Sequence, residues 1–202
     1  MTSKYIACLA AGAASIWLIG AGIPHTQAGE IADLAAEAEE LIGRGNGAEA
    51  LERLREAMIL VAGEMPLSVR EATFVTNDPP GFGVYDPRQD AVFAADEPLV
   101  AYVEPVGVTW IDAGEGYLSS ALTVDFELLS ETGQVLAQQD GFGNFSFTSR
   151  EHNLEVMTHL TLEVSGAPAG AYVLRYIYTD TNSGEMASID LPFEIAEGVA
   201  AE

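Results

Sequence analysis

The pattern of hydrophobic and polar residues divides the chain into two parts with different periods. Apolar residues recur every three to four positions over residues 30–63, the period of an amphipathic α-helix, and the glycine-rich stretch 43–47 interrupts them. From Pro66 onward apolar and polar residues alternate, which is the period of a β-strand with one buried face. The pattern therefore predicts two antiparallel helices followed by a β-rich segment.

The β-rich segment is punctuated by Gly, Pro, Asp and Asn, which mark turns between short strands. Strands are predicted at 71–76, 99–108, 118–130, 134–139, 142–148, 155–165, 171–179 and 186–195. Tyr172 follows a tight turn at the start of a predicted strand, as in the tyrosine corner of immunoglobulin-like domains. Pro192 predicts an edge position for the last strand, because proline donates no hydrogen bond to a neighbour.

These patterns predict a mainly β protein with a short α segment: an antiparallel immunoglobulin-like β-sandwich preceded by a helical hairpin. On the second helix, the residues expected to face inward are Ala50, Leu51, Leu54, Ala57, Met58 and Val61. The hairpin is similar to one tetratricopeptide repeat at Gly45, Ala50, Leu54 and Ala57. A single unit does not form a stable solenoid. We therefore expect it to dock on the rest of the protein or on another copy.

The N-terminal 28 residues have the features of a secretory signal peptide. Lys4 precedes an uncharged apolar run over residues 5–23, Pro24 ends that run, and small residues at Thr26 and Ala28 predict cleavage after Ala28. The run is also long enough to cross a bilayer, so an uncleaved inner-membrane anchor is the alternative. The predicted organisation is a signal peptide at 1–28, a helical hairpin at 29–65, a β-sandwich at 66–196 and an acidic tail at 197–202.

The net charge of the chain limits the kinds of partner that it can bind. The 202 residues include 31 Asp and Glu against 8 Lys and Arg, a net charge of -23, which argues against a nucleic-acid partner. A single cysteine is too few for a cysteine-based zinc site or a disulfide framework. Residues 89–149 contain no Lys or Arg. This acidic span favours either a basic partner or simple solubility.

Several stretches together resemble a family of uncharacterised exported proteins of Gram-negative bacteria, over roughly residues 60–195. They are residues 65–67, 81–85, 97–99, 102–107, 149–150, 180–184 and 191–193, with the letters MPL, GFGVY, EPL, YVEPVG, SR, DTNSG and LPF. The resemblance implies export to the periplasm or secretion, and a β-sandwich of the immunoglobulin or fibronectin III kind. It implies no catalytic residues, because no activity is assigned to the family.

Three groups of residues are candidates for metal ligands. Asp180, Asn182 and Glu185 lie in one predicted turn, where alternate oxygen ligands suit Ca²⁺; a hairpin loop explains the same residues. Asp78, Asp86 and Asp90 form a second acidic loop with the same two interpretations. His152, Met157 and His159 offer imidazole and thioether ligands for copper, although a Met157 packed in the core and an ordinary hydrogen bond of His159 are the favoured interpretation.

The sequence contains no serine-nucleophile, zinc-protease or phosphate-loop motif, and we predict neither an enzyme nor a cofactor. We expect an exported binding or envelope-assembly module that has no membrane contact after signal cleavage and pairs with another envelope protein or a basic partner. The first alternative is a Ca²⁺-dependent or small-ligand, carbohydrate-binding module with exposed Tyr85, Trp110 or Tyr117. The second is an unrecognised hydrolase, which requires two converging carboxylates.

Overall fold

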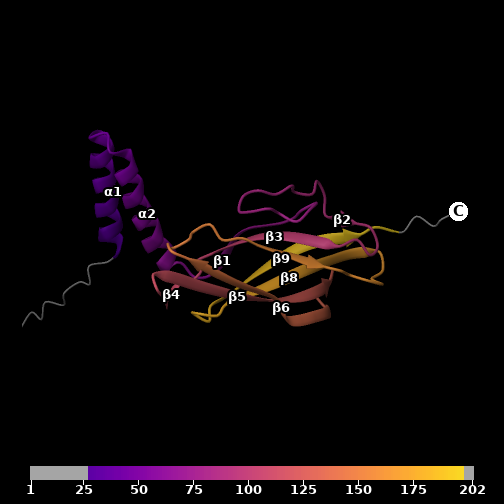
Figure 1. Cartoon of the computed structure of the whole chain (residues 1–202). Coiled ribbons are helices and arrows are strands. Elements are labelled where there is room, and N and C mark those ends of the chain that lie inside the picture. The colour runs from indigo at the N-terminus through magenta and orange to yellow at the C-terminus, as the bar shows by residue number, and fades with distance from the viewer. Residues whose placement is uncertain (1–26, 198–202) are drawn as a thin grey trace, which may run out of the picture.

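The computed structural model describes residues 27–197, and the chain within them is mainly β with two helices, as predicted (Figure 1). Residues 1–26 of the predicted signal peptide and residues 198–202 of the predicted tail lie outside the described range. The first helix begins at Gln27, so the predicted cleavage site after Ala28 falls in its first turn.

The two helices form an antiparallel hairpin. Helix α1 spans Gln27–Gly43 and α2 spans Gly47–Glu64. The turn between them uses Gly45 at φ 81°, a left-handed conformation that glycine adopts without steric cost. Buried Ala38, Ala50 and Ala57 let the two helices approach closely, because an alanine side chain takes little space.

The strands follow the alternating pattern closely. They are β1 (Ser68–Phe74), β2 (Val92–Phe93), β3 (Leu99–Val106), β4 (Ile111–Gly114), β5 (Tyr117–Ser130), β6 (Val135–Ser149), β7 (Thr158–Leu162), β8 (Gly170–Asp180) and β9 (Met186–Ile195). The two strands predicted at 134–139 and 142–148 are one strand, β6, because its pairing with β5 continues through a bulge next to Gly141. The short strands β2 and β4 lack a clear alternating pattern and were not predicted.

The strands form two sheets that share one hydrophobic core. The smaller sheet has the order β1-β3-β7, and the larger has the order β2-β9-β8-β5-β4, with β6 also paired to β5. Val103 and Leu160 of the smaller sheet belong to the same buried cluster as Val124 and Tyr176 of the larger. Gly143 lies where β6 passes close to β7: a Cβ added there would be 2.8 Å from Leu160 Cδ2. The larger sheet therefore curls toward the smaller one.

Two local predictions can be compared with the strand pairing. Pro192 lies in β9, and β2 pairs only with the last two residues of that strand, Glu194 and Ile195. Pro192 thus has a single neighbouring strand, as an edge proline requires. The Tyr172 hydroxyl donates a hydrogen bond of 2.7 Å to the Pro168 carbonyl, the contact expected of a tyrosine corner.

Candidate functional site

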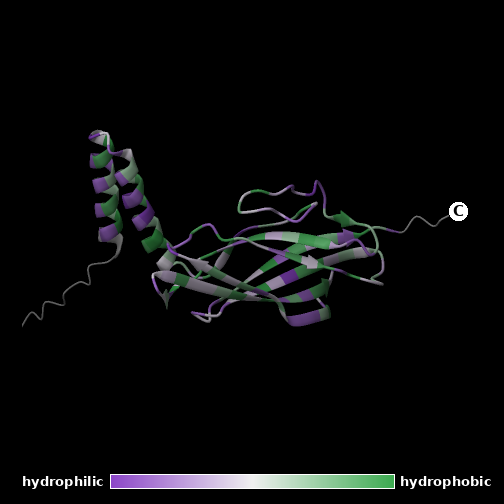
Figure 2. Ribbon diagram, viewed as in Figure 1, coloured by the Kyte–Doolittle hydropathy of each residue, from purple (hydrophilic) through white to green (hydrophobic). Residues whose placement is uncertain are grey.

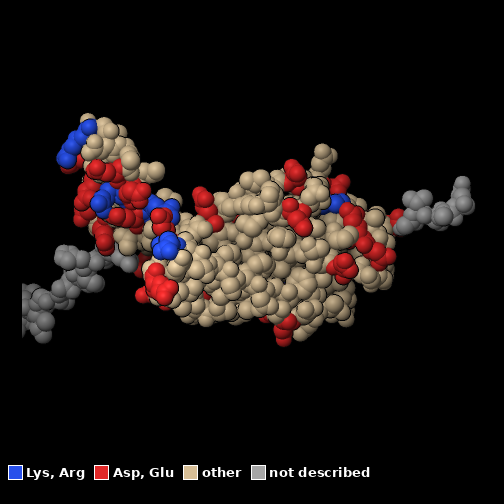
Figure 3. Space-filling model, in the orientation of Figure 1, with Lys and Arg blue, Asp and Glu red and all other residues tan. Residues whose placement is uncertain are grey.

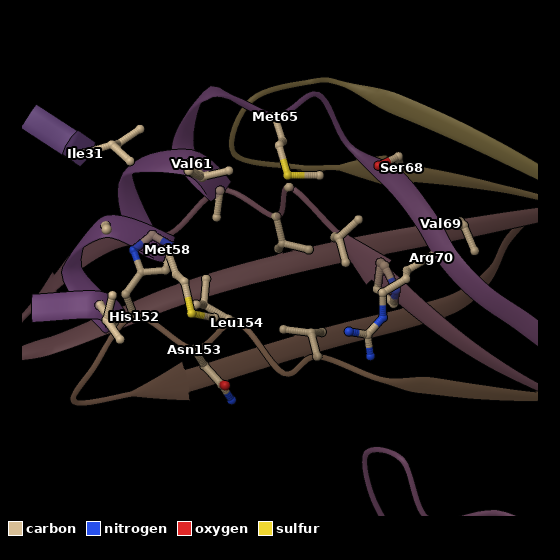
Figure 4. A pocket seen from close by; sticks show the side chains of 18 of the residues that line it. Ile31, Met58, Val61, Met65, Ser68, Val69, Arg70, His152, Asn153 and Leu154 are labelled. Atoms are coloured by element: carbon tan, nitrogen blue, oxygen red, sulfur yellow. The ribbon is translucent and has the colours of Figure 1, made fainter. Parts of the chain in front are cut away.

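A groove of about 830 Å³ lies where the helical hairpin meets the β-domain, residues 66–196. Its walls come from α1, α2, the start of β1, the end of β3 and the segment 152–156 (Figure 4). Four polar residues line it, and they are Ser68, Arg70, His152 and Asn153. Every other lining residue is apolar or glycine. A cavity of this size and lining is suited to an apolar partner.

Helix α2 supplies much of the apolar wall. Leu54, Met58, Val61 and Met65 line the groove, and they remain 40%, 57%, 43% and 39% exposed. The spacing of four and three residues places Leu54, Met58 and Val61 on one stripe of the helix, as at the a and d positions of a coiled coil, and Met65 follows directly after the last helical residue. Figure 2 shows hydrophobic residues on the part of α2 that approaches the β-domain.

The prediction for the inward face of α2 is wrong for four of its six residues. Ala50 and Ala57 are buried, whereas Leu51, Leu54, Met58 and Val61 are exposed. The hairpin has only two helices, so one narrow stripe of α2 contacts α1 and the larger residues beside it remain 40% to 65% exposed. Sequence reasoning missed the groove for this reason. The sequence feature that could have indicated the groove is the width of the apolar face of α2, which exceeds what one neighbouring helix can cover.

Two contacts set the position of the hairpin on the β-domain. Gly107, at the end of β3, has φ 75°, and a Cβ there would lie 2.5 Å from the Pro66 carbonyl oxygen in the linker after α2. On the other side, Arg55 of α2 donates a hydrogen bond of 2.9 Å to the His152 carbonyl and lies 3.4 Å from Glu151. The groove lies between these two points of attachment.

A buried carboxylate adjoins the groove at Arg70. Glu104 is 4% exposed and accepts hydrogen bonds from the Arg70 guanidinium and, at 2.5 Å, from the Tyr102 hydroxyl. Burial and the bond to Glu104 raise the pKa of Tyr102 to about 12. The same hydroxyl accepts a 2.7 Å bond from the Gly83 amide, and Tyr85 stacks on the Tyr102 ring. This network fastens the loop between β1 and β2 onto β3.

The predicted calcium ligands organise a turn between β8 and β9. Asp180 is fully buried, and its carboxylate accepts hydrogen bonds from the amides of Thr109, Asn182 and Ser183. The Asn182 side chain donates to the Thr109 carbonyl, and the Glu185 carboxylate accepts from the Leu67 amide at 2.8 Å. Calcium at this turn stays a prediction from the sequence. The hairpin-loop interpretation accounts for the contacts of Asp180 with Asn182 and Ser183, and the bonds to Thr109 and Leu67 join the turn to distant segments.

The second acidic loop is spread along the connection between β1 and β2. Asp78, Asp86 and Asp90 are exposed, and the Asp90 carboxylate accepts a hydrogen bond from the Val92 amide. Among residues 27–197, no three His, Cys, Asp or Glu side chains converge as a metal site would require.

The predicted copper ligands lie in different surroundings. His152 lines the groove, its ring 6.1 Å from that of Trp110, and burial lowers its pKa. His159 is exposed on β7, opposite Tyr102 of β3. Met157 is half-buried directly before β7 and does not line the groove. Copper binding also stays a prediction from the sequence.

The aromatic residues proposed for a carbohydrate platform are partly covered. Tyr85 stacks on Tyr102 with ring centroids 4.1 Å apart, and the Arg150 guanidinium lies 4.3 Å above the Tyr117 ring. Trp110 is half-buried next to His152.

Two acids have a lowered pKa, and both are paired with arginine. The pKa of Glu97 is lowered by the Ala94 amide and by Arg88, and that of Asp190 by Arg175. Neither lines the groove. In the view of Figure 3, acidic atoms surround the hairpin, and most of the β-domain face is uncharged.

No helix among residues 27–197 is both long enough and apolar enough to cross a membrane.

Comparisons with known proteins assign no family. No family model and no curated protein matches the chain. Solved structures with some likeness include a Niemann-Pick type C2 protein from Japanese carpenter ant, with 8% identity and a TM-score of 0.41 over 65% of this chain and 94% of that one. A family 123 glycoside hydrolase from Clostridium perfringens has 10% identity and a TM-score of 0.41 over 68% and 28%. A Pseudomonas fluorescens alkylpurine DNA glycosylase has 13% identity and a TM-score of 0.35 over 76% and 39%. Likeness at this level carries no inference about fold or function.

Proposed function

We propose that this chain is an exported, non-enzymatic binding protein whose groove, between the helical hairpin and the β-domain, receives an apolar helix of another envelope protein. One observation carries the proposal: a groove of about 830 Å³ whose lining is apolar except at four residues. Burying such a surface against a partner is favourable, at about 25 cal/mol per Å² of apolar area removed from water.

The spacing of the groove residues favours a helix as the occupant. Leu54, Met58, Val61 and Met65 present a coiled-coil stripe, and α1 adds Ile31 beside it. The two helices of the hairpin already touch through alanine, so a third helix packed on this stripe would complete a three-helix arrangement. An extended strand would find few free backbone groups on a helix surface and is a poorer fit.

Export rests on the N-terminal sequence and on the resemblance to exported proteins of Gram-negative bacteria. We propose a periplasmic or secreted protein, with an uncleaved inner-membrane anchor as the alternative. The intact mass of protein recovered from the host envelope tests this. A chain that begins at Gly29 supports cleavage, and a mass that includes Met1 supports the anchor.

We also propose that the β-domain is an immunoglobulin-like sandwich. The strand orders β1-β3-β7 and β9-β8-β5-β6 correspond to an A-B-E sheet facing a G-F-C-C′ sheet. The bond from Tyr172 to Pro168 supports the same reading, because a tyrosine corner lies at the start of strand F, here β8. Folds of this class present binding surfaces for many unrelated partners.

The enzyme and carbohydrate alternatives have less support in the described part of the chain. The acids with a lowered pKa are held by arginine and lie away from the groove, whereas a catalytic pair would converge in a pocket. Tyr85, Trp110 and Tyr117 form no open platform, since each is half-buried.

The proposal is tested with a labelled peptide that forms an amphipathic helix, carrying leucine at a and d positions and lysine or glutamine elsewhere. Met58→Gln should weaken its binding by about tenfold, because a polar side chain replaces an apolar one in the centre of the groove. Leu51→Gln is the matched control, since Leu51 lies on the same helix, is 65% exposed and does not line the groove. Equal binding by both variants would reject the groove as the site.

A further inference from the structure

Strand β6 leaves a long edge of the larger sheet without a neighbour. It pairs with β5 alone, and residues 135–141 are exposed. Within residues 27–197, no backbone hydrogen bond from a turn or loop reaches this stretch. Within this stretch, side chains bond the backbone only at Gly141, whose amide donates to Asp125 and whose carbonyl accepts from Asn144. Alternate residues of such an edge direct their amides and carbonyls to solvent, which is a template for another strand.

The other sheet edges carry the features that prevent strand addition. The strands β2, β4 and β7 are short, with two, four and five residues. β1 contains the charged Arg70 and Glu71 and a bulge between Val69 and Glu71, and the free part of β9 contains Pro192. Short length, charge, bulges and proline all discourage pairing with another chain.

β6 is long, has little charge and contains no proline, so bulges are the main feature of this kind that it carries. It spans 15 residues with one charged residue, Asp140, and with no lysine, arginine or proline. Val135 and Leu136 are 43% and 49% exposed. One bulge lies within this stretch at Leu136, and the other lies at its end next to Gly141. The edge at 135–141 is therefore the one in the described sheets that most favours strand addition.

A second cavity, of about 430 Å³, opens between the sheets beside the same stretch. Leu136 and Ala137 of β6 form one side, and Glu163 with the connection to β8 forms the other. Core residues Phe126 and Tyr172 line its interior. Because successive side chains of a strand point to opposite faces, every second residue of an added strand would face this cavity.

The charges around the edge favour a cationic occupant. β6 lies within the base-free span 89–149. Asp140 on the strand, Glu131 at the preceding turn and Glu163 at the cavity take part in no ion pair among the described residues. A second copy of this chain would bring the same acids and its own net charge of -23, which repel.

We propose that residues 135–141 of β6 form a strand-addition site for an extended segment of another polypeptide. That segment would continue the larger sheet, place an apolar side chain in the cavity at Leu136, and present Lys or Arg to Asp140, Glu131 and Glu163. Recognition of this kind takes affinity from main-chain hydrogen bonds and specificity from pockets for alternate side chains. The site is separate from the groove and does not depend on it.

The probe is a synthetic peptide of about ten residues that alternates valine and lysine, at the upper end of the usual range of strand lengths. We expect amide hydrogen exchange at 135–141 to slow when it binds. The same peptide methylated at every backbone nitrogen keeps its side chains and charge but donates no main-chain hydrogen bond. Its affinity should be at least about tenfold weaker. Equal binding of the two peptides, or slowed exchange elsewhere in the chain, would overturn the proposal.

Two protein variants complete the test. Leu136→Pro blocks the edge at a bulge, where proline is tolerated, and should weaken binding by about tenfold. Met58→Gln alters the groove and should leave this peptide's affinity unchanged, so the proposal for the groove and the proposal for the edge are tested independently.

Sedimentation of the protein alone should give a monomer. A dimer that Leu136→Pro abolishes would assign the edge to a second copy and refute the polypeptide partner.

Discussion

At the scale of single residues, the buried acids of this protein hold loops together. The Asp180 carboxylate accepts hydrogen bonds from three backbone amides, and the Glu104 carboxylate accepts them from the Tyr102 hydroxyl and the Arg70 guanidinium. A carboxylate out of water is tolerated only when its oxygens have partners. The sequence singles out Asp180 as a candidate metal ligand but not Glu104, and the structure accounts for both acids as ties between distant segments.

Replacing Asp180 tests this assignment. Asp180→Ala leaves the amides of Thr109 and Asn182 without their acceptor, so we expect the free energy of unfolding to fall by about 2–3 kcal/mol in urea denaturation. Asp140→Ala, at an exposed acid, should change it by less than about 0.5 kcal/mol. If calcium raised the melting temperature of the wild type and a chelator lowered it, a metal would be the main partner of Asp180.

Glu97 predicts how stability depends on pH. The Ala94 amide and the Arg88 guanidinium lower its pKa from the usual 4.5. Its folded form therefore binds a proton less readily than the unfolded chain, so its contribution is complete above about pH 5 and is lost as the pH falls through the folded pKa. In thermal melts between pH 6 and 3, Glu97→Gln should lose less stability than the wild type. Parallel curves would contradict this, and Glu131→Gln is the control.

At the scale of elements, close backbone contacts decide how the segments join. Gly143 lets β6 pass over Leu160, and Gly107 lets the end of β3 meet Pro66 in the linker after α2. Both positions lack room for a side chain, and Gly107 also has a positive φ.

Gly107→Ala should destabilise the protein and loosen the groove. The new Cβ would meet the Pro66 carbonyl, and backbone at that φ is strained for alanine, so we expect a loss of about 2 kcal/mol or more. Gly63→Ala, in α2 with nothing within 4 Å, should instead stabilise slightly. Urea denaturation compares the two, and a neutral Gly107→Ala would show that the linker adapts.

At the scale of the whole molecule, the hairpin extends from one end of the β-domain and leaves the groove between them (Figure 1). Besides the linker, a polar tie from Arg55 to the segment at His152 holds it in place. The shape of the groove should therefore depend on this tie more than the stability of either part does.

Arg55→Ala should widen the distribution of hairpin positions while the β-domain melts normally. We expect faster amide exchange in α2 and a weaker affinity for the helical peptide probe, because Arg55 no longer holds His152 at the groove. Arg53→Ala is the control, since Arg53 pairs with Glu56 and Glu37 within the hairpin. Equal amide exchange in α2 of both variants would show that Arg55 does not hold the hairpin in position.

Much of the fold was predictable because it depends on local pattern. The helices at 30–63 and the strands near 118–130, 171–179 and 186–195 agree with the structure to within a few residues. The strand β2 was not predictable, since two residues form no periodic pattern and are a strand only because they pair with Glu194 and Ile195 of β9. The groove was missed because an apolar residue on a helix does not reveal which neighbour covers it.

The sequence by itself determined the mainly β class, the hairpin, the turns and the acidic charge, since periodicity and turn residues act over short distances. Only the tertiary structure decided that Leu54 and Met58 line a groove rather than a core, that Asp180 serves a distant loop, and that β6 remains an open edge. These depend on contacts between residues far apart in the chain, and two sequences with the same pattern can differ in them.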